Sequence, residues 1–233
     1  MSAEVVVVTG GGRGIGRAIC RRFAADGARI VAAARSGDEL AETQRLVQQD
    51  GGTCRTIKTN VASSADVEKM IGMAVREFSR VDVLVNNAGV ACNNSIEEFD
   101  LQVFDAMMAV NVGGVFYACR AVWPVMREHG GGVIVNISSV AAVDPFPGFA
   151  AYGASKACVE ALTRGLAAEG QACGIRVYGV GPGAVDTQML RGPFPDFPPE
   201  QCLKPADVAE AVWMMTQPSC QYSVGQTLYV KKS

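Results

Sequence analysis

Short runs of apolar, often β-branched residues alternate with longer segments of helical periodicity along the chain. Most of the short runs are nearly continuously apolar, which is typical of strands buried on both faces of a sheet. The pattern predicts strands at residues 5–8, 29–33, 53–59, 81–85, 132–137, 175–180 and 226–230. It predicts helices near residues 15–26, 38–50, 64–79, 100–128, 152–173 and 205–216. This alternation predicts a parallel sheet with helices on both faces.

Local signals agree with the alternation. Ser63 followed by Asp66 resembles a capping motif at the start of the third helix, and Pro205 suits the first turn of the last one. One segment departs from the pattern, because residues 188–204 hold four of the ten prolines. A structureless stretch of this kind is more often a functional loop than a broken element.

Length and composition restrict the class of protein. The 233 residues suit one domain, and 49% hydrophobic residues can form a substantial core. A net charge of −2 offers no basic surface for nucleic acid or an anionic membrane. The first apolar run begins at Glu4-Val5, which leaves no room for a signal peptide, and no run approaches the ~18 apolar residues of a membrane helix. We expect a cytoplasmic protein without nucleic-acid or membrane partners.

The cysteines and the single histidine exclude two classes of site. The eight cysteines are scattered without a C-x-x-C pair, and His129 is the only histidine. A zinc site or a histidine-based triad is therefore not expected, and we predict no metal. Five of the cysteines occur in contexts typical of reduced core residues or neutral fillers: Cys20, Cys54, Cys119, Cys158 and Cys173.

Tyr152 and Lys156 are the first candidates for chemistry. If their segment is helical, residues four apart lie on one face, which places a phenol beside an ammonium. A free phenol titrates near pH ~10, and a neighbouring cation lowers that pKa by favouring the phenolate. The pair could donate a proton to a carbonyl or accept one from an alcohol. The same spacing also occurs by chance on exposed helices.

A glycine-rich turn follows the first predicted strand. Gly10, Gly14 and Gly16 give the spacing G-x-x-x-G-x-G and lead into a predicted helix. Glycines let backbone N–H groups approach a pyrophosphate, and the helix N-terminus adds its dipole. A plain structural turn is the alternative, but the strand–turn–helix context favours a dinucleotide site. We therefore predict a Rossmann-type, doubly wound α/β fold with seven mostly parallel strands and helices on both faces.

The residue after the second predicted strand bears on the cofactor. That residue is Arg35, where NAD-binding folds usually place a carboxylate for the ribose hydroxyls. An arginine instead suits the 2′-phosphate of NADP, and Arg13 in the glycine turn could approach the same phosphate. Two solvated arginines are the alternative. We predict NADP(H) as the preferred cofactor, with NAD(H) as the other candidate.

The chain as a whole resembles the short-chain dehydrogenase/reductase family. The motifs that carry the resemblance follow the family's order and spacing over nearly the whole chain: Thr9-Gly-x-x-x-Gly-x-Gly16, Asn86-Asn-Ala-Gly89, Asn111, Ser139, Tyr152-x-x-x-Lys156 and Pro182-Gly183-x-x-x-Thr187. The branch it is most similar to contains 3-oxoacyl-carrier-protein reductases and related carbonyl reductases. The resemblance implies one dinucleotide-binding and catalytic domain over residues 1–233, with a substrate loop at about 188–204.

The resemblance implies four catalytic residues. Ser139, thirteen residues before Tyr152, would polarise the substrate oxygen, whereas Ser138 has a spacing one residue too long. Tyr152 would transfer the proton, and Lys156 would bind the nicotinamide ribose and lower the pKa of Tyr152. In the family, Asn111 lies at a helix kink and holds a proton-relay water together with the lysine. Without the family, Ser139 could equally cap a turn and Asn111 lie on a helix surface.

The resemblance also implies the cofactor contacts. Asn60 and Val61 would lie along the adenine, and the segment ending at Gly89 would pass the adenine ribose. The backbone of Val185 and the hydroxyl of Thr187 would hold the nicotinamide carboxamide. The full predicted set is Gly10, Arg13, Gly14, Ile15, Gly16, Arg35, Asn60, Val61, Asn87, Ala88, Gly89, Tyr152, Lys156, Pro182, Gly183, Val185 and Thr187.

The implied function is reversible hydride transfer between a nicotinamide and a small-molecule carbonyl or secondary alcohol. Phenylalanines in the segments expected around the substrate suit a medium-sized, partly apolar carbonyl: Phe146, Phe149, Phe194 and Phe197. The alternatives are a 3-oxoacyl-thioester reductase, an NAD-dependent alcohol dehydrogenase and a non-catalytic NADPH-binding sensor or scaffold. The first is weakened because Gly130 and Cys173 stand where carrier-docking basic residues are usual in the family. The intact set of four catalytic residues argues against the sensor.

Family members usually assemble through two long helices, here predicted near 100–128 and 152–173. Small and apolar residues along the second of these helices give limited support from the sequence itself: Ala157, Ala161, Gly165 and Ala168. The same residues could equally pack on the sheet. A homodimer or homotetramer is therefore the expected state.

Overall fold

The computed structural model describes residues 3–232; Met1, Ser2 and Ser233, which the predicted domain 1–233 includes, lie outside the described residues. One sheet of seven strands has the order β3-β2-β1-β4-β5-β6-β7. Every neighbouring pair is parallel, so the predicted sheet is confirmed. The strands are β1 (Val5–Thr9), β2 (Arg29–Ala34), β3 (Thr53–Lys58), β4 (Val83–Asn86), β5 (Gly132–Ile137), β6 (Ile175–Pro182) and β7 (Thr227–Val230).

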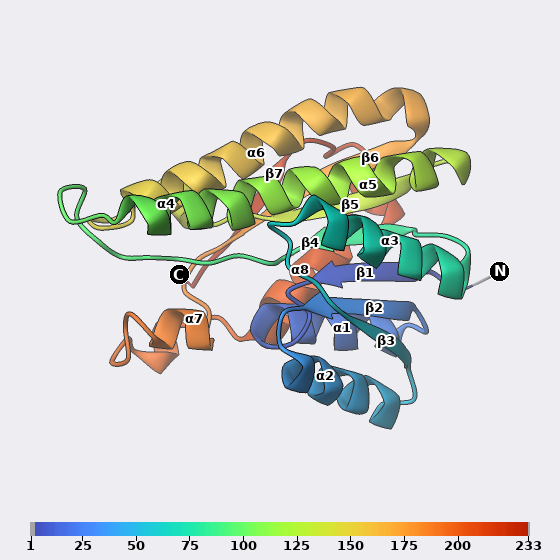
Figure 1. Cartoon of the computed structure of the whole chain (residues 1–233), viewed down its shortest axis with the longest axis horizontal. Helices are drawn as coiled ribbons and strands as arrows, with labels where there is room; N and C mark the ends of the chain where they lie inside the picture. Colours follow the sequence, from blue (N-terminus) through green and yellow to red (C-terminus); the bar gives the residue numbers. More distant parts are fainter. Residues whose placement is uncertain (1–2, 233) are drawn as a thin grey trace.

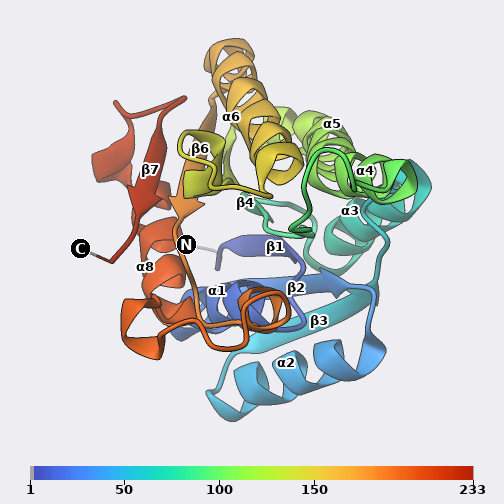
Figure 2. The ribbon, with the colours of Figure 1, turned by 90° about the vertical axis from the view of Figure 1, so that its left-hand side faces the viewer.

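Helices cover both faces of the sheet (Figures 1 and 2). On one side lie α1 (Gly14–Ala25), α2 (Gly37–Gln49) and α8 (Pro205–Thr216). On the other lie α3 (Ser64–Phe78), α5 (Gly114–Glu128) and α6 (Ala150–Gly170). Each face carries its own cluster of buried hydrophobic residues, because alternate strand residues point to opposite faces. The doubly wound architecture predicted from the sequence is therefore present.

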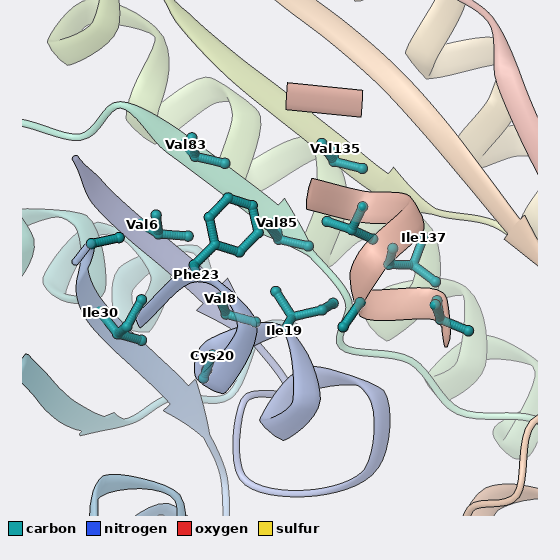
Figure 3. Packing of buried hydrophobic residues seen from close by; sticks show 14 of the residues in the cluster. Val6, Val8, Ile19, Cys20, Phe23, Ile30, Val83, Val85, Val135 and Ile137 are labelled. Carbon is teal, nitrogen blue, oxygen red and sulfur yellow. The ribbon is translucent and has the colours of Figure 1, made fainter. Parts of the chain in front are cut away.

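The core under α1 illustrates how the apolar runs are used (Figure 3). Val6 and Val8 of β1 pack with Ile19 and Phe23 of α1, and all four side chains are at most 1% exposed. In register, Val6 lies opposite Ile30 of β2 and Val83 of β4. A β1 buried on both faces needs an almost unbroken apolar run, as the sequence has.

The capping signals act as predicted. The Ser63 hydroxyl accepts a hydrogen bond from the Asp66 N–H at 3.3 Å, and Asp66 accepts from the Asn60 N–H at 3.2 Å. Pro205 is the first residue of α8. The Ser63 contact satisfies an N–H group that a helix start leaves without a partner, and both helices begin where the sequence placed them.

The helix predicted at 100–128 is interrupted. It consists of α4 (Leu101–Met108), a π-helical turn, η1 (Ala109–Gly113), and α5. Asn111 lies in the middle of the π-helical turn and is completely buried. Such turns are rare and frequently occur at functional sites. The interruption agrees with the kink that the family resemblance implied.

The prediction that residues 188–204 lack structure is wrong in detail. The segment contains a short helix, α7 (Gln188–Arg191), and a 3₁₀ turn, η4 (Pro199–Gln201). Arg191 holds the segment together by donating to the Asp186 carboxylate at 2.9 Å and to the Phe197 carbonyl. These charge-assisted hydrogen bonds from Arg191 add to the backbone hydrogen bonds of the segment.

One helix of the described chain, Leu101–Glu128, is long and apolar enough on average to cross a membrane. No uninterrupted apolar run of that length exists in it, because polar residues such as Gln102 and Asn111 intervene. The helix packs on β4, β5 and α3, and helices that cover a sheet meet the same criterion.

Two adjacent glycines before β5 provide a test of the packing that places this strand. Gly130 and Gly131 both have positive φ, but only a Cβ on Gly131 would meet backbone, at 2.3 Å from the Gly174 oxygen. We expect Gly130→Ala to cost ~1 kcal/mol and Gly131→Ala ~2 kcal/mol more, measured as free energies of unfolding in urea. Equal costs would contradict the close approach of the β5 and β6 starts.

Candidate active site

A single cavity of about 1310 Å³ opens at the carboxyl edge of the sheet. This is the edge toward which the strand arrows point in Figure 1, and α7 lies beside it. The cavity is lined by every predicted site residue except Asn111: Gly10, Arg13, Gly14, Ile15, Gly16, Arg35, Asn60, Val61, Asn87, Ala88, Gly89, Ser139, Tyr152, Lys156, Pro182, Gly183, Val185 and Thr187. Residues from seven separate parts of the sequence thus share one space.

The glycine turn is packed too closely for larger residues. Gly10 and Gly14 have positive φ, and a Cβ on Gly16 would lie 2.2 Å from the Gly10 oxygen. Helix α1 begins at Gly14, so its free N–H groups face the cavity. Such an N-terminus favours an anion, and the glycines leave room for its close approach. The residues present therefore fit the pyrophosphate of a dinucleotide.

Thr9 joins the glycine turn to the chain after β4. Its hydroxyl accepts hydrogen bonds from the N–H groups of Asn87 and Ala88 at 3.0 and 3.1 Å. The Asn87 amide donates in return to the Thr9 carbonyl at 2.9 Å. Asn87 therefore fixes the glycine turn from the side, and its side chain has this structural task besides lining the cavity.

Glu39 and Gln188 contact one of the predicted phosphate-binding arginines and were not predicted from the sequence. Arg13 donates to the Glu39 carboxylate at 3.1 Å and to the Gln188 side-chain oxygen. Arg35 lines the same cavity and has no ion-pair partner within residues 3–232. Glu39 lies in the first turn of α2, where acidic residues favour the helix dipole. Its position in the sequence, shortly after the end of β2, could have indicated that Glu39 lies near the cofactor-binding arginines.

Ser139, Tyr152 and Lys156 meet at the end of β5. Lys156 donates from Nζ to the Ile137 carbonyl at 2.9 Å, and Nζ lies 5.8 Å from the centre of the Tyr152 ring. Burial lowers the pKa of Lys156 to about 8. Burial also raises the pKa of Tyr152, while a hydrogen bond with Ser139 acts in the opposite direction.

The prediction that the neighbouring lysine lowers the pKa of Tyr152 is therefore wrong, because in the structure this pKa is raised. Tyr152 and Lys156 are only 9% and 5% exposed. Removal from water disfavours the charged form of both groups, the phenolate and the ammonium. Spacing along the sequence could indicate their proximity, but not the depth at which the fold buries them.

Asn111 lies behind the cavity wall. Its amide donates to the Val90 carbonyl at 2.9 Å and to the Ser155 hydroxyl at 3.0 Å, and its oxygen accepts from the Val90 N–H at 2.9 Å. A Cβ on Gly89 would meet the Asn111 oxygen at 3.3 Å and the Lys156 nitrogen at 3.4 Å. Asn111 thus holds the backbone beside the lysine. Ser155, three residues after Tyr152 on the same helix, was missed by sequence reasoning.

A second polar cluster supports the serine loop. Ser138 donates to the buried Glu160 carboxylate at 2.8 Å, and the Tyr229 hydroxyl donates to the same group at 2.8 Å. Burial, followed by the contact with Glu160, raises the pKa of Tyr229 to about 12. Glu160 therefore connects β5, α6 and β7 next to Ser139. Glu160 follows Lys156 by one helical turn, and this spacing could have indicated that its side chain lies near the site.

Comparison with known proteins gives a family and close structural likenesses. The model of the family described as short chain dehydrogenase matches residues 4–196. A 3β-hydroxysteroid dehydrogenase from Eggerthella lenta is 36% identical, covering 99% of this chain and 93% of that protein. A 2-(R)-hydroxypropyl-CoM dehydrogenase from Xanthobacter autotrophicus is 36% identical, covering 97% of this chain and 96% of that protein.

Two solved structures superpose closely. Levodione reductase has a TM-score of 0.92 and 29% identity, covering 98% of this chain and 96% of that one. A 7α-hydroxysteroid dehydrogenase, complexed with NADH and 7-oxo glycochenodeoxycholic acid, has a TM-score of 0.92 and 29% identity, covering 98% of this chain and 92% of that one. Sequence, fold and cavity agree: the chain belongs to the short-chain dehydrogenase/reductase family, whose members are oxidoreductases that act on hydroxyl or carbonyl groups with a nicotinamide cofactor.

Proposed function

We propose that the protein is an NADP(H)-dependent oxidoreductase that interconverts a carbonyl and a secondary alcohol, with Tyr152 as general acid and base. The observation that carries this is the single cavity shared by Ser139, Tyr152, Lys156 and the glycine turn. The family supplies the reaction class. We also propose that residues 1–233 form one dinucleotide-binding and catalytic domain, with 188–204 as its substrate loop.

The chain's own residues would do the following. Ser139 would donate a hydrogen bond to the substrate oxygen, and Tyr152 would give it a proton in reduction or take one in oxidation. Lys156 would bind ribose hydroxyls of the cofactor, while Asn111 would hold the backbone at Gly89 and Val90 in place beside Lys156. Bound NADP(H) supplies or takes up the hydride. The hydrogen bond with Ser139 also favours the phenolate formed when the proton leaves.

The preference for NADP(H) depends on charge near the end of β2. Arg35 supports it because it lines the cavity without an ion-pair partner in the described chain. Glu39 opposes it, since its carboxylate already pairs with Arg13 and would repel a 2′-phosphate. NAD(H) use is therefore the second candidate, and one structural relative is described with NADH.

We also propose a cytoplasmic homodimer or homotetramer. Exposed hydrophobic side chains along the helix pair α4 and α5 support assembly, among them Leu101 at 77% and Phe116 at 47% exposure. A smaller hollow of about 320 Å³ lies between α5 and α6, lined by Phe116, Trp123 and Leu166 among others. Apolar surface of this kind is typical of an interface between subunits.

Removing the Tyr152 hydroxyl tests the proposed function. We expect Tyr152→Phe to lose at least ~100-fold in kcat, about 2.7 kcal/mol of transition-state stabilisation, while NADPH binding persists. Tyr178→Phe is the matched control, because this buried tyrosine donates to the Cys220 carbonyl and lies outside the cavity. Steady-state turnover and fluorescence titration of NADPH measure the two quantities. Undiminished turnover of Tyr152→Phe would reject the assignment.

Cofactor choice can be measured as the ratio of kcat/KM for NADPH to that for NADH. We expect Arg35→Ala to lower the ratio at least ~10-fold, because a charge-assisted hydrogen bond to phosphate is lost. Glu39→Gln should raise it several-fold by removing a repulsive charge. Arg55→Ala, at an exposed ion pair outside the cavity, should leave the ratio unchanged. An unaltered ratio in Arg35→Ala would leave NAD(H) as the better assignment.

Burial of Lys156 predicts a pH-dependent stability. Its pKa is about 8 in the folded chain against an ordinary value of 10.5, so between these pH values the unfolded chain binds a proton that the folded chain does not. Stability due to this group therefore rises with pH across that window. Between pH ~7.5 and ~9.5 we expect wild type to gain about 2 kcal/mol relative to Lys156→Met in urea unfolding.

Comparison with Lys156→Met is needed because other groups act in the opposite sense. Burial raises the pKa of Cys20, Cys54 and Cys119, so the folded chain keeps their protons longer and loses stability as pH rises. These contributions cancel in the difference. Parallel pH profiles for the two proteins would show that Lys156 is not desolvated.

A further inference from the structure

Three phenylalanines wall one end of the cavity. The rings of Phe146 and Phe149 have centroids 4.3 Å apart, and Phe194, which follows α7, lies 5.9 Å from both. Phe149 meets the Tyr152 ring edge-on at 5.3 Å. We call Phe146, Phe149 and Phe194 the aromatic wall. It begins at the phenol that would transfer the proton.

The aromatic wall leaves apolar surface uncovered at the mouth of the cavity. Phe146 is 50% exposed although Phe149 behind it is buried. The neighbouring lining is also apolar and includes Val90, Ala91, Val140, Met189, Leu190 and Phe197. Apolar surface that lines a concave site is recovered from water when a ligand covers it.

The charges at this end of the cavity are acidic. Asp144 and Asp186 line it, and Asp186 is paired with Arg191 at 2.9 Å, whereas Asp144 is exposed and has no ion pair within residues 3–232. Lys156 is buried and donates to a backbone carbonyl. The cavity's arginines come instead from the glycine turn, the first turn of α1 and the end of β2. Arg191, on the same segment as Phe194, does not line the cavity and is already paired with Asp186. Among the described residues that line the cavity, no unpaired cation therefore lies beside the aromatic wall to hold a phosphate, sulfonate or carboxylate.

We propose that the substrate is an uncharged ring ketone, or the matching ring alcohol, whose ring system lies on the aromatic wall. The proposal rests on the proposed function. In reduction the carbonyl carbon would accept a hydride from the nicotinamide and the oxygen a proton from Tyr152, which gives the secondary alcohol and oxidised cofactor. A rigid ring covers the wall without the loss of rotational freedom that an open chain incurs. Thioesters of CoA or an acyl carrier are disfavoured because their phosphates meet no cation here.

Ring preference is tested with a pair of ketones. A fused bicyclic ketone and an open-chain ketone of the same carbon number are compared by kcat/KM with NADPH. We expect the ring to be favoured about tenfold, and Phe194→Ala and Phe146→Ala each to reduce that preference about two- to tenfold, mainly through KM. Tyr222→Ala removes an aromatic residue that is 92% exposed and outside the cavity, and should leave the preference intact.

Charge preference is tested with a cyclohexanone carboxylate and its methyl ester. Wild type should have the higher kcat/KM for the ester. Asp144→Lys should raise the ratio of kcat/KM for the acid to that for the ester about fivefold, the effect of about 1 kcal/mol of charge interaction in water. Asp50→Lys makes the same charge change at an exposed residue that follows α2, outside the cavity, and should not alter the ratio. Raised salt should weaken the effect of Asp144→Lys.

A small activated diketone separates the two levels of the argument. If wild type reduces no carbonyl at all, including the diketone, the proposed function and this inference both fail. If it reduces the diketone but favours the open chain over the ring, or the acid over the ester, only the inference is overturned. Ring and ester preferences that depend on the aromatic wall and Asp144 would support it.

Discussion

The parallel pairing of β1 with β2 on one side and β4 on the other is the constraint on which the site depends. At β1 the strand order changes direction, so the chain leaves toward opposite faces on the two sides. The loops that follow β1 and β4 therefore diverge and leave a crevice at the carboxyl edge. Thr9 and Asn87 bridge its floor and keep the glycine turn in place. The other site residues lie on or after strands whose places in the sheet are set relative to β1 and β4.

Burial determines the electrostatics of the proposed catalytic residues. Tyr152 and Lys156 both lose access to water, which disfavours phenolate and ammonium alike. The fold compensates with directed dipoles, the Ile137 carbonyl at the lysine and the Ser139 hydroxyl at the tyrosine. Such preorganised groups need not reorganise when charge moves during the reaction. The same burial that disfavours the charged forms of Tyr152 and Lys156 would make the proposed proton transfer sensitive to any charge bound beside them.

The sequence predicted the sheet because strands buried on both faces need apolar runs such as Val5–Val8, a local property. It predicted the members of the site because their spacing resembles that of a known family. It did not predict contacts between distant segments: Glu39 and Gln188 on Arg13, Glu160 on Ser138, Arg191 within its own loop. These pairs depend on how elements pack, and no periodicity encodes them. The upward shift of the Tyr152 pKa has the same origin, since depth of burial is a property of the whole fold.

Arg13 links the region proposed to bind the cofactor with the region proposed to bind the substrate. Its guanidinium contacts Glu39 at the start of α2 and Gln188 at the start of α7. The chain continues from α7 into Phe194, which completes the aromatic wall. Arg191, at the end of α7, donates a hydrogen bond to the Phe197 carbonyl. A phosphate that drew Arg13 away from Gln188 would remove the contact between the glycine turn and the start of α7. The charge proposed to select the cofactor would therefore also help to set the surface on which the proposed substrate would lie.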